Sequence, residues 1–510
     1  LKELGLKAER IHSGRDRQSS NQACRDYLAG HLDFLFVAPE RLGVPGFAEL
    51  LARQKLALIA VDEAHCISHW GHDFRPDYRL LMERLELLRR GATEGDILET
   101  LETPEDRVPI IGLTATATPR VQDDIAEQLG LQDPARYILG FRRDNLEIEI
   151  VDLPLDERAA AVKRALKSKK RVPAIVYAPS RRQTHELTEA LNQEAAGEEG
   201  LRAVAYHAGL PSAERDQAQT AFLSGRAEII VATIAFGMGI DKADVRTVIH
   251  TALPGSVEAY YQEIGRAGRD GKRSRVILLH SWADRRTHAF FHQRDYPKVE
   301  QLAEIFNALG DEPGPRDALR EAVSLDHEIF EKALEKLWIH GGAIVDAEDR
   351  VQRGADTWQK PYVIQRDHRS LQVEQIAALA ETTDCRMLAL VQHFGDRADS
   401  GEPCGLCDVC APERSVAVRY RAPDDAETRE LEALLRALRA GGGSQAAGAT
   451  FRRGFEARMS RDDFESLQRS LCRARMISEE QDAFEKDGRV IEFKRLRLSP
   501  GADALLDDLP

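Results

Sequence analysis

The sequence predicts an α/β protein with two doubly wound parallel-sheet lobes, followed by smaller and mainly helical modules. In residues 1–295, short apolar runs alternate with polar stretches of helix length, which is the order expected of βαβ units. After residue 296, helical patterns take over. At 510 residues the chain is too long for one ordinary domain, which agrees with several units.

The first lobe, residues 1–140, contains three apolar runs that we expect to be strands. Near-continuous apolar runs of this length are typical of strands buried on both faces of a parallel sheet. The charged stretch between Leu81 and Val108 predicts a surface insertion. The three runs are FLFVAPE at 34–40, LALIAVDE at 56–63 and PIIGLTATAT at 109–118.

The second lobe, residues 141–295, repeats the alternation with five further apolar runs. Two such lobes in one chain predict a ligand in the cleft between them. The runs lie at 173–179, 202–209, 227–236, 246–254 and 274–281.

Three modules are expected after the lobes. Residues 296–365 show three helical patterns and two short strand-like pieces, which predict a winged-helix-like insertion. Residues 366–412 hold a cysteine cluster and predict a metal-binding module. Residues 426–510 repeat the winged-helix pattern and end in a hairpin with Asp-Gly at its turn. The run GGGSQAAGA at 441–449 is expected to be a loop.

Charge and composition limit the functional classes. The formal net charge is −14, whereas a passive nucleic-acid coat usually carries a basic excess. With 43% hydrophobic and 31% charged residues, the chain is typical of globular proteins. Because we find no apolar run long enough to span a bilayer, we expect no membrane partner. The expected location is cytoplasmic, associated with the nucleoid if the source is bacterial.

Asp62 and Glu63 end the second apolar run of the first lobe. The carboxyl ends of parallel strands form the crevice in which open α/β sheets bind ligands. There Asp62 can hold Mg²⁺, usually through water, while Glu63 can polarise the water that attacks the γ-phosphate of ATP. An Asp-Glu pair at a strand end also occurs by chance, but the four letters DEAH, which end at His65, narrow the pattern greatly.

Four of the seven cysteines cluster at the start of the last quarter of the chain. Thiolates with paired two-residue spacings suit a tetrahedral structural Zn²⁺, although a triple C-x₂-C-x₂-C run also occurs in iron–sulfur ligation. The remaining cysteines are isolated and are expected to be ordinary packed residues. The clustered cysteines are Cys385, Cys404, Cys407 and Cys410.

The run AVDEAHCISHWGHDFRPDY, residues 60–78, closely resembles the signature of the RecQ family of superfamily 2 DNA helicases. That signature joins a DEAH box to an aromatic-rich loop that senses single-stranded DNA. The resemblance implies that Trp70, Phe74 and Arg75 contact the DNA, and aromatic faces and arginine planes do bind unpaired bases with little sequence preference. His69 departs from the family, which usually has glutamine there.

Further motifs follow in the order that the family has them. LTATAT resembles motif III, FRRDNL at 141–146 resembles the connection between the lobes, and YYQEIGRAGRDG at 260–271 resembles motif VI. The resemblance implies RecA-like lobes with His65 among the catalytic residues and with DNA contacts at Thr114, Thr116, His207 and Thr233. It implies nucleotide contacts at Gly239, Asp241, Arg266 and Arg269. The last two stand three residues apart, so on one helix both can face the same crevice.

The cysteine cluster also resembles the family, in CRMLALVQHFGD and EPCGLCDVC, which favours zinc over iron. Family members usually place this module directly after the second lobe. Here the winged-helix-like segment at 296–365 is expected to lie between them, which leaves the substrate preference open.

One required part is missing from the sequence. A P-loop needs a glycine-rich turn with Gly-Lys followed by Ser or Thr, but the single Gly-Lys, at Gly271, is followed by Arg273 within the second lobe. The family keeps this motif upstream of the segment that opens this chain, so we expect an N-terminal truncation. The polypeptide is therefore expected to bind ATP poorly and to hydrolyse little of it.

The resemblance therefore implies an ATP-dependent DNA helicase that moves 3′ to 5′ and acts in replication and recombinational repair, with ATP, Mg²⁺ and Zn²⁺ as cofactors. Expected partners are single-stranded and partly duplex DNA, single-strand-binding protein and repair proteins. Two alternatives stay open. One is another superfamily 2 helicase, acting on RNA. The other is a non-enzymatic DNA-binding or annealing fragment, because the P-loop is absent.

Overall fold

The chain forms two compact units, Leu1–Cys410 and Ala411–Pro510, in a computed structural model. No helix among the described residues is both long and apolar enough to cross a membrane. The described residues are 1–68, 71, 78, 81–90, 108–138, 140–194, 201–237, 240–346, 348–382, 384–417, 423–474, 476–486 and 489–508.

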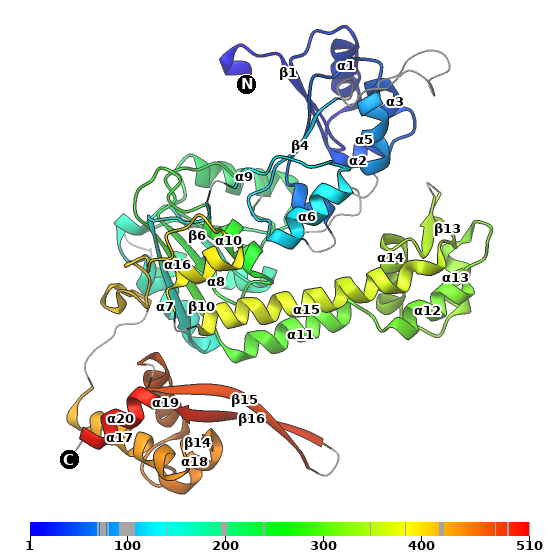
Figure 1. The fold of residues 1–510 in the computed structure, drawn as a ribbon. Coiled ribbons are helices and arrows are strands. Elements are labelled where there is room, and N and C mark those ends of the chain that lie inside the picture. Colours follow the sequence, from blue (N-terminus) through cyan, green and yellow to red (C-terminus); the bar gives the residue numbers. More distant parts are fainter. Residues whose placement is uncertain are drawn as a thin grey trace. The chain divides into compact units, whose positions relative to one another are not determined.

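The described strands of the first lobe form two separate two-stranded parallel sheets. β1 (Ala8–Ile11) pairs with β2 (Phe34–Val37), and β3 (Ile59–Val61) pairs with β4 (Ile110–Gly112). The helices around these strands contribute to one buried core (Figure 1). The helical segments are η1 (Lys2–Leu4), α1 (Arg17–Leu28), α2 (Pro39–Leu42), α3 (Phe47–Leu51), η2 (Ala64–Ile67), α5 (Leu81–Arg90) and α6 (Pro119–Gln128).

The expectation that the strands of the first lobe are buried on both faces is wrong for β2. Leu35 and Val37 pack against the core, whereas Phe34 and Phe36 are 45% and 57% exposed. Successive side chains of a strand point to opposite faces, so β2 is covered on one face. An apolar run predicts a strand but does not reveal how many layers cover it.

Helix α5 replaces the first part of the expected surface insertion. Leu81, Leu85 and Leu88 are buried in the core of the first lobe. Their spacing of four and three residues puts them on one helix face, so the charges of this stretch occupy the other faces. The rest of the expected insertion, residues 91–107, lies outside the described residues.

The second lobe is a six-stranded parallel sheet in the order β5-β10-β9-β6-β8-β7. Every residue of β6, β8 and β9 is buried, which confirms the expectation for these apolar runs. Strand β5 was not among the expected strands. The strands are β5 (Leu146–Asp152), β6 (Ala174–Tyr177), β7 (Ala203–Tyr206), β8 (Ile229–Ala232), β9 (Thr247–His250) and β10 (Ser274–His280). The helical segments are α7 (Leu155–Leu166), η4 (Lys169–Arg171), α8 (Arg181–Glu194), α9 (Ser212–Leu223) and α10 (Val257–Ile264).

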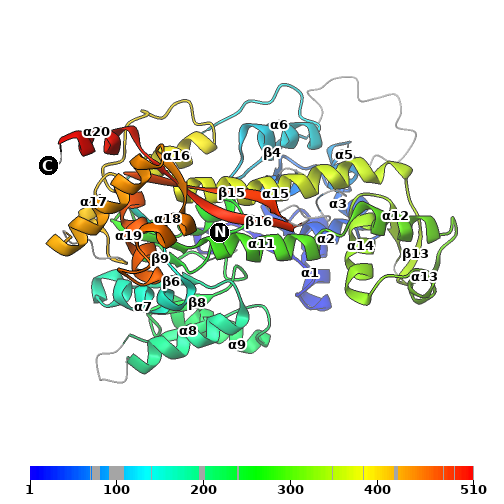
Figure 2. The ribbon, with the colours of Figure 1, turned by 90° about the horizontal axis from the view of Figure 1, so that it is seen from below.

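A long helical pair leaves the second lobe and carries the inserted module. Helix α11 (Trp282–Asp295) leads out and α15 (Gln359–Glu381) leads back beside it, as both ribbon views show (Figures 1 and 2). Helix α15 runs without a break through the expected boundary between residues 365 and 366. The cysteine-bearing module continues from α15 with α16 (Arg386–His393) and η6 (Pro412–Arg414).

The inserted module has the helix and strand order expected of a winged helix. Its three-stranded sheet has the order β11-β13-β12, and its buried core includes Phe330, Leu337 and Trp358. The elements are α12 (Val299–Ala308), β11 (Gly314–Pro315), α13 (Arg316–Ala322), α14 (His327–Ile339), β12 (Ala343–Val345), β13 (Arg350–Arg353) and η5 (Asp356–Trp358).

The second unit repeats this order with a longer hairpin. The expectation of a loop at 441–449 is wrong, because Ser444–Ala446 forms strand β14 and pairs with β16. The sheet satisfies the backbone groups of this short, small-residue run, which composition alone assigns to a loop. The elements are α17 (Asp425–Ala440), β14, α18 (Ala447–Gly454), α19 (Arg461–Arg473), β15 (Ile477–Lys486), β16 (Arg489–Leu498) and α20 (Pro500–Asp508). The Asp-Gly turn at 487–488 lies outside the described residues.

Candidate nucleotide site and metal centre

A cavity of about 1500 Å³ within the first unit gathers residues from both lobes. Its walls come from the ends of β3 and β4, from the segment joining the lobes and from the turn after α10. Asp62 is exposed at the end of β3 and is not among the lining residues. The expected site residues that line the cavity are Glu63, Thr114, Asp241, Arg266 and Arg269.

Glu63 stands in a strained backbone conformation at the carboxyl end of β3. Its φ and ψ of 49° and 42° lie in the left-handed region, which non-glycine residues seldom occupy and which clusters at functional sites. The Glu63 amide donates a hydrogen bond to Oδ1 of Asp62 at 2.8 Å. The turn therefore directs the two neighbouring carboxylates differently, with only Glu63 reaching the cavity.

His65 lies behind Glu63 and is 1% exposed. Its Nδ1 atom stands 3.4 Å from Oε2 of Glu63 and 3.0 Å from Oγ1 of Thr114. The Thr114 oxygen also accepts the amide N–H of Thr116 at 3.3 Å. Thr116 itself is 1% exposed, so the interior of the lobe surrounds its side chain. The acidic residue at β3 and the hydroxyl after β4 are thus joined through one imidazole.

Arg266 and Arg269 follow helix α10 rather than lie within it, because α10 ends at Ile264. Both arginines nevertheless line the cavity. Arg266 is 7% exposed, and Nη1 of Arg269 lies 3.1 Å from Oδ1 of Asp241. Two guanidinium groups lining one cavity suit a ligand with several negative charges.

A buried pair that joins β9 to α10 was not singled out from the sequence. Nε2 of His250 lies 2.6 Å from Oε2 of Glu263, and the imidazole stacks on Tyr177 with ring centroids 5.1 Å apart. Glu263 belongs to the YYQEIGRAGRDG motif, but His250 carries no sequence signal that marks it as its partner.

Several expected contacts lie outside the described residues. These are the DNA contacts at Trp70, Phe74 and Arg75, the neighbouring His69, and the nucleotide contact at Gly239.

His207 and Thr233 follow the neighbouring strands β7 and β8. His207 is 5% exposed, and its Nε2 atom lies 2.8 Å from Nε2 of His185. Burial lowers the pKa of His207, and the nearby His185 and Arg181 lower it further. The Thr233 amide donates to the carbonyl oxygen of Tyr206 at 3.2 Å. Both residues thus lie at the same carboxyl edge of the sheet.

The four expected metal ligands come together. The Sγ atoms of Cys385, Cys404, Cys407 and Cys410 all lie within 4.8 Å of one another. A tetrahedral zinc–thiolate site has Zn–S bonds of about 2.3 Å and hence S–S separations of about 3.8 Å, so the cluster fits one zinc ion. An iron–sulfur cluster places several atoms between its thiolates and holds them farther apart.

Backbone groups also support thiolates at this centre. The amide of Cys404 donates to Sγ of Cys385 at 3.1 Å, and the amides of Leu406 and Cys407 donate to Sγ of Cys404 at 3.4 Å each. Hydrogen bonding from Cys404 lowers the pKa of the Cys407 thiol below its ordinary range. N–H···S bonds of this kind stabilise the charged sulfur that a metal binds.

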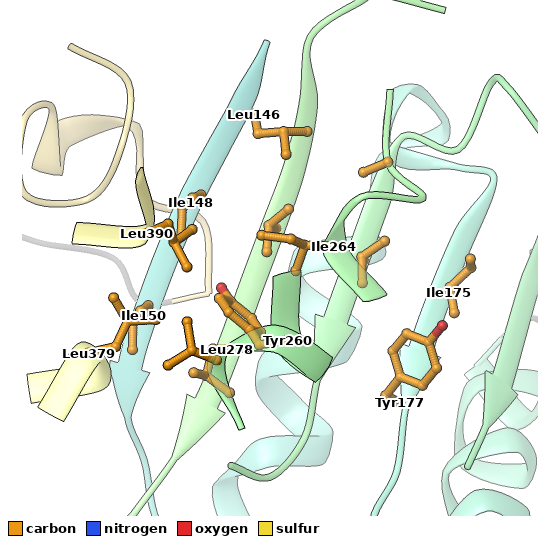
Figure 3. Close-up of a cluster of buried hydrophobic side chains, with 14 of the residues drawn as sticks. Leu146, Ile148, Ile150, Ile175, Tyr177, Tyr260, Ile264, Leu278, Leu379 and Leu390 are labelled. Carbon is orange, nitrogen blue, oxygen red and sulfur yellow. The ribbon is translucent and has the colours of Figure 1, made fainter. Parts of the chain in front are cut away.

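The metal centre is attached to the edge of the second-lobe sheet. Asp408 donates its amide N–H to the carbonyl oxygen of Ile148 at 2.9 Å and accepts the amide N–H of Ile150 at 3.1 Å. Arg386 binds both carboxylate oxygens of Asp408, at 2.9 and 3.2 Å. Figure 3 shows Leu379 and Leu390 against Ile148 and Ile150 of β5. The module therefore covers the edge strand of the sheet.

Protein-family comparisons match three parts of the chain. The family described as "DEAD/DEAH box helicase" matches residues 1–125, and "Helicase conserved C-terminal domain" matches 157–271. The family described as "RecQ zinc-binding" matches residues 350–411, which hold the four cysteines.

Full-chain comparisons find relatives with related names. The chain is 31% identical to the probable ATP-dependent DNA helicase RecS of Bacillus subtilis, over 78% of this chain and 75% of that protein. It is also 31% identical to the ATP-dependent DNA helicase RecQ of Pasteurella multocida, over 80% of this chain and 50% of that protein. The chain spans about half the length of that RecQ and of its Haemophilus influenzae counterpart. Among solved structures, the DUF1998 helicase MrfA bound to DNA aligns with a TM-score of 0.42 and 17% identity, over 70% of this chain and 51% of that one.

Two α/β lobes sharing a cavity of acidic residues and arginines, together with a four-cysteine module, define the class of superfamily 2 helicases. Within that class, the cysteine module and the extent of the match to RecS decide the assignment. The chain belongs to the RecQ family.

Proposed function

We propose that the protein is an ATP-dependent DNA helicase that moves 3′ to 5′ along one strand. The observation that carries the proposal is the convergence of Glu63, Asp241, Arg266 and Arg269 on one cavity. A nucleoside triphosphate presents several negative charges and needs a positioned water, and this set of groups suits both requirements. The names of the relatives support DNA as the substrate.

Each cavity residue has a proposed part in hydrolysis. Asp62 would hold Mg²⁺, which would supply positive charge to neutralise the phosphates. Glu63 orients the attacking water and accepts its proton, and His65 holds the Glu63 carboxylate at 3.4 Å. The guanidinium groups of Arg266 and Arg269 stabilise the charge that develops on the γ-phosphate.

DNA is proposed to reach this chemistry through the aromatic loop. Trp70, Phe74 and Arg75 stack on unpaired bases, and His207 and Thr233, at the carboxyl edge of the second-lobe sheet, lie along the strand's path. Thr116 is buried, so its side chain is not assigned a DNA contact. Further proposals follow from the family assignment. They are roles in replication and recombinational repair, contact with single-strand-binding protein and a cytoplasmic location.

The test uses the full-length protein with four substrates: 3′-tailed DNA duplexes, 5′-tailed DNA duplexes, tailed RNA duplexes and blunt DNA. We expect unwinding of the 3′-tailed DNA alone, with ATP hydrolysis stimulated by single-stranded DNA. Glu63→Gln is expected to lower turnover by about 100-fold or more while DNA binding persists. Trp70→Ala is expected to retain basal hydrolysis and to lose its DNA stimulation. Unwinding of RNA would favour an RNA helicase, and DNA annealing without hydrolysis would favour a non-enzymatic platform.

A further inference from the structure

The guanidinium group of Arg143 binds the turn that carries Arg266 and Arg269. Its Nη2 atom donates to the carbonyl oxygens of Ala267 at 2.9 Å and Gly268 at 3.3 Å. Its Nη1 atom donates to the carbonyl oxygen of Gly265 at 3.4 Å. Residues 265–269 are called the arginine turn below. The Arg143 side chain thus binds three carbonyl groups of the arginine turn.

One of the three carbonyl groups belongs to the end of α10, because Gly265 is its C-cap residue. The last carbonyls of a helix have no partner inside the helix and carry its negative dipole end. A guanidinium group at this end therefore satisfies the Gly265 oxygen and is attracted by the dipole, and it binds the next residues of the turn at the same time. Without Arg143, the turn loses three anchors in the stretch that includes Arg266.

Asn145 fixes the far side of the same turn. Its Nδ2 atom donates to the carbonyl oxygens of Gly268 at 2.8 Å and Lys272 at 3.0 Å. A Cβ atom at Gly268 would stand 2.5 Å from that Nδ2 atom, and Gly268 has a φ of +59°. A side chain at Gly268 would therefore meet both a close contact and a strained backbone.

The cysteine module holds the segment from which Arg143 extends. Residues 141–145 are called the connector. The Phe141 ring stacks on Phe394 with centroids 4.5 Å apart and planes 9° apart, and the Phe141 amide donates to Oδ2 of Asp396 at 3.1 Å. Arg142 binds both carboxylate oxygens of Asp399, at 2.5 and 2.7 Å.

The module also touches helix α10 directly. Nε2 of His393 lies 2.8 Å from Oε1 of Glu258, and the hydroxyl of Tyr261 donates to the carbonyl oxygen of Phe141 at 2.7 Å. The connector is therefore enclosed by the cysteine module on one side and by α10 with its arginine turn on the other.

We propose that Arg143 is a positioning residue for Arg266 and Arg269, and that the cysteine module keeps the connector in place to allow it. This inference rests on the proposed ATP hydrolysis. It predicts that disturbing the metal-binding module slows hydrolysis through the connector, separately from any effect on DNA binding. A small displacement of a charge-stabilising group costs catalysis more than it costs substrate binding.

The experiment compares full-length wild-type protein with Arg143→Ala, Arg143→Lys and Asp399→Asn. Amide hydrogen exchange is followed in residues 265–272, together with kcat, KM for ATP and Kd for single-stranded DNA. Arg143→Ala is expected to speed exchange in this segment and to lower kcat by about 10-fold or more, with KM and Kd within about 3-fold. Lysine keeps the charge but reaches fewer carbonyls, so Arg143→Lys should recover part of the loss. Asp399→Asn should give a smaller change in the same direction.

Arg226→Ala is the matched control, because Arg226 is exposed and its guanidinium contacts Ser224 of its own turn. It should leave both exchange and kcat unchanged. Unaltered exchange at 265–272 in Arg143→Ala would overturn the inference, as would a change in KM alone. If Arg143→Ala does not fold, unaltered exchange and kcat in both remaining variants would overturn it. A wild-type protein without ATP hydrolysis would instead refute the proposed function, while the exchange data would still decide the anchoring of the turn.

Discussion

The Nδ1 atom of His65 lies 3.0 Å from the Oγ1 atom of Thr114. The two residues follow different strands, β3 and β4, which pair in parallel. Because His65 also faces Glu63 at 3.4 Å, a shift of the segment after β4 is transmitted to the carboxylate in the cavity. This contact connects motif III to the DEAH box through a single buried ring.

Replacing Thr114 by valine should therefore slow hydrolysis without weakening DNA binding. The substitution keeps the shape but removes the hydroxyl that orients His65. Loss of one such hydrogen bond is worth about 1 kcal/mol, or about 5-fold in rate. The measurement is kcat for DNA-stimulated hydrolysis by the full-length protein, with Kd for single-stranded DNA beside it. Thr114→Ser keeps the hydroxyl and should stay close to wild type. Weakened DNA binding at unchanged kcat would show that Thr114 serves the DNA instead.

The sequence predicted the parts of the molecule in which the residue pattern directly reflects burial, or in which interacting residues are close in the sequence. Strands β6, β8 and β9 are central in the sheet, so burial on both faces left an apolar signal. The metal ligands were predicted for a similar reason, since three of them are near neighbours in the sequence.

Strand β5 shows why other parts were missed. Its run LEIEIVD alternates, because Ile148 and Ile150 face the cysteine module while Glu147 and Glu149 lie near Arg275. Such a strand does not contain a continuous apolar run, so that pattern does not predict it.

Sequence patterns also do not predict contacts between residues that are far apart in the chain. Arg142 and Asp399 bind each other across 257 positions of the chain, and neither residue's neighbourhood identifies its partner. Likewise, the letters of the sequence identify the arginine turn, but its anchoring by Arg143 arises only in the folded structure.

The cysteine module should contain one zinc ion per chain. Four thiolates within 4.8 Å leave room for one ion. Elemental analysis is expected to find zinc at one equivalent, and the purified protein should be colourless. Cys407→Ser should lose the metal and about 4 kcal/mol or more of stability, since a tightly bound ion stabilises the folded state by mass action. A brown protein that contains iron would contradict this prediction.

The pair of Arg386 and Asp408 should be far more important for stability than a surface pair. Their side chains are 9% and 6% exposed. Removing one partner leaves the other charge buried without an opposite charge. Asp408→Ala is expected to cost about 3–5 kcal/mol in the free energy of unfolding, measured by denaturant titration with zinc content checked in parallel. The matched control is Arg285 with Glu381, whose side chains are 34% and 58% exposed. Glu381→Ala should cost about 1 kcal/mol or less. Equal costs for the two variants would contradict the proposed attachment of the module to β5.

His207 should make the fold less stable in acid. Burial, followed by the charges of His185 and Arg181, lowers its pKa below the ordinary 6.5. Above pH 6.5 both the folded and the unfolded chain leave this ring neutral, so it contributes no pH dependence. As the pH falls below 6.5, the unfolded chain takes up a proton that the folded chain resists, and the free energy of unfolding decreases until the lowered pKa is passed.

The measurement is Tm between pH 7.5 and 5.5 for wild type and His207→Gln, whose amide nitrogen can still bond to the imidazole of His185. The wild type should lose more Tm over this interval than the variant, because glutamine does not titrate. His31→Gln, at an exposed histidine, controls for the general effect of removing one imidazole and should keep the wild-type pH dependence. The distance of 2.8 Å between Nε2 of His207 and Nε2 of His185 requires one ring to donate and the other to accept. An unchanged pH dependence in His207→Gln would contradict the lowered pKa of His207.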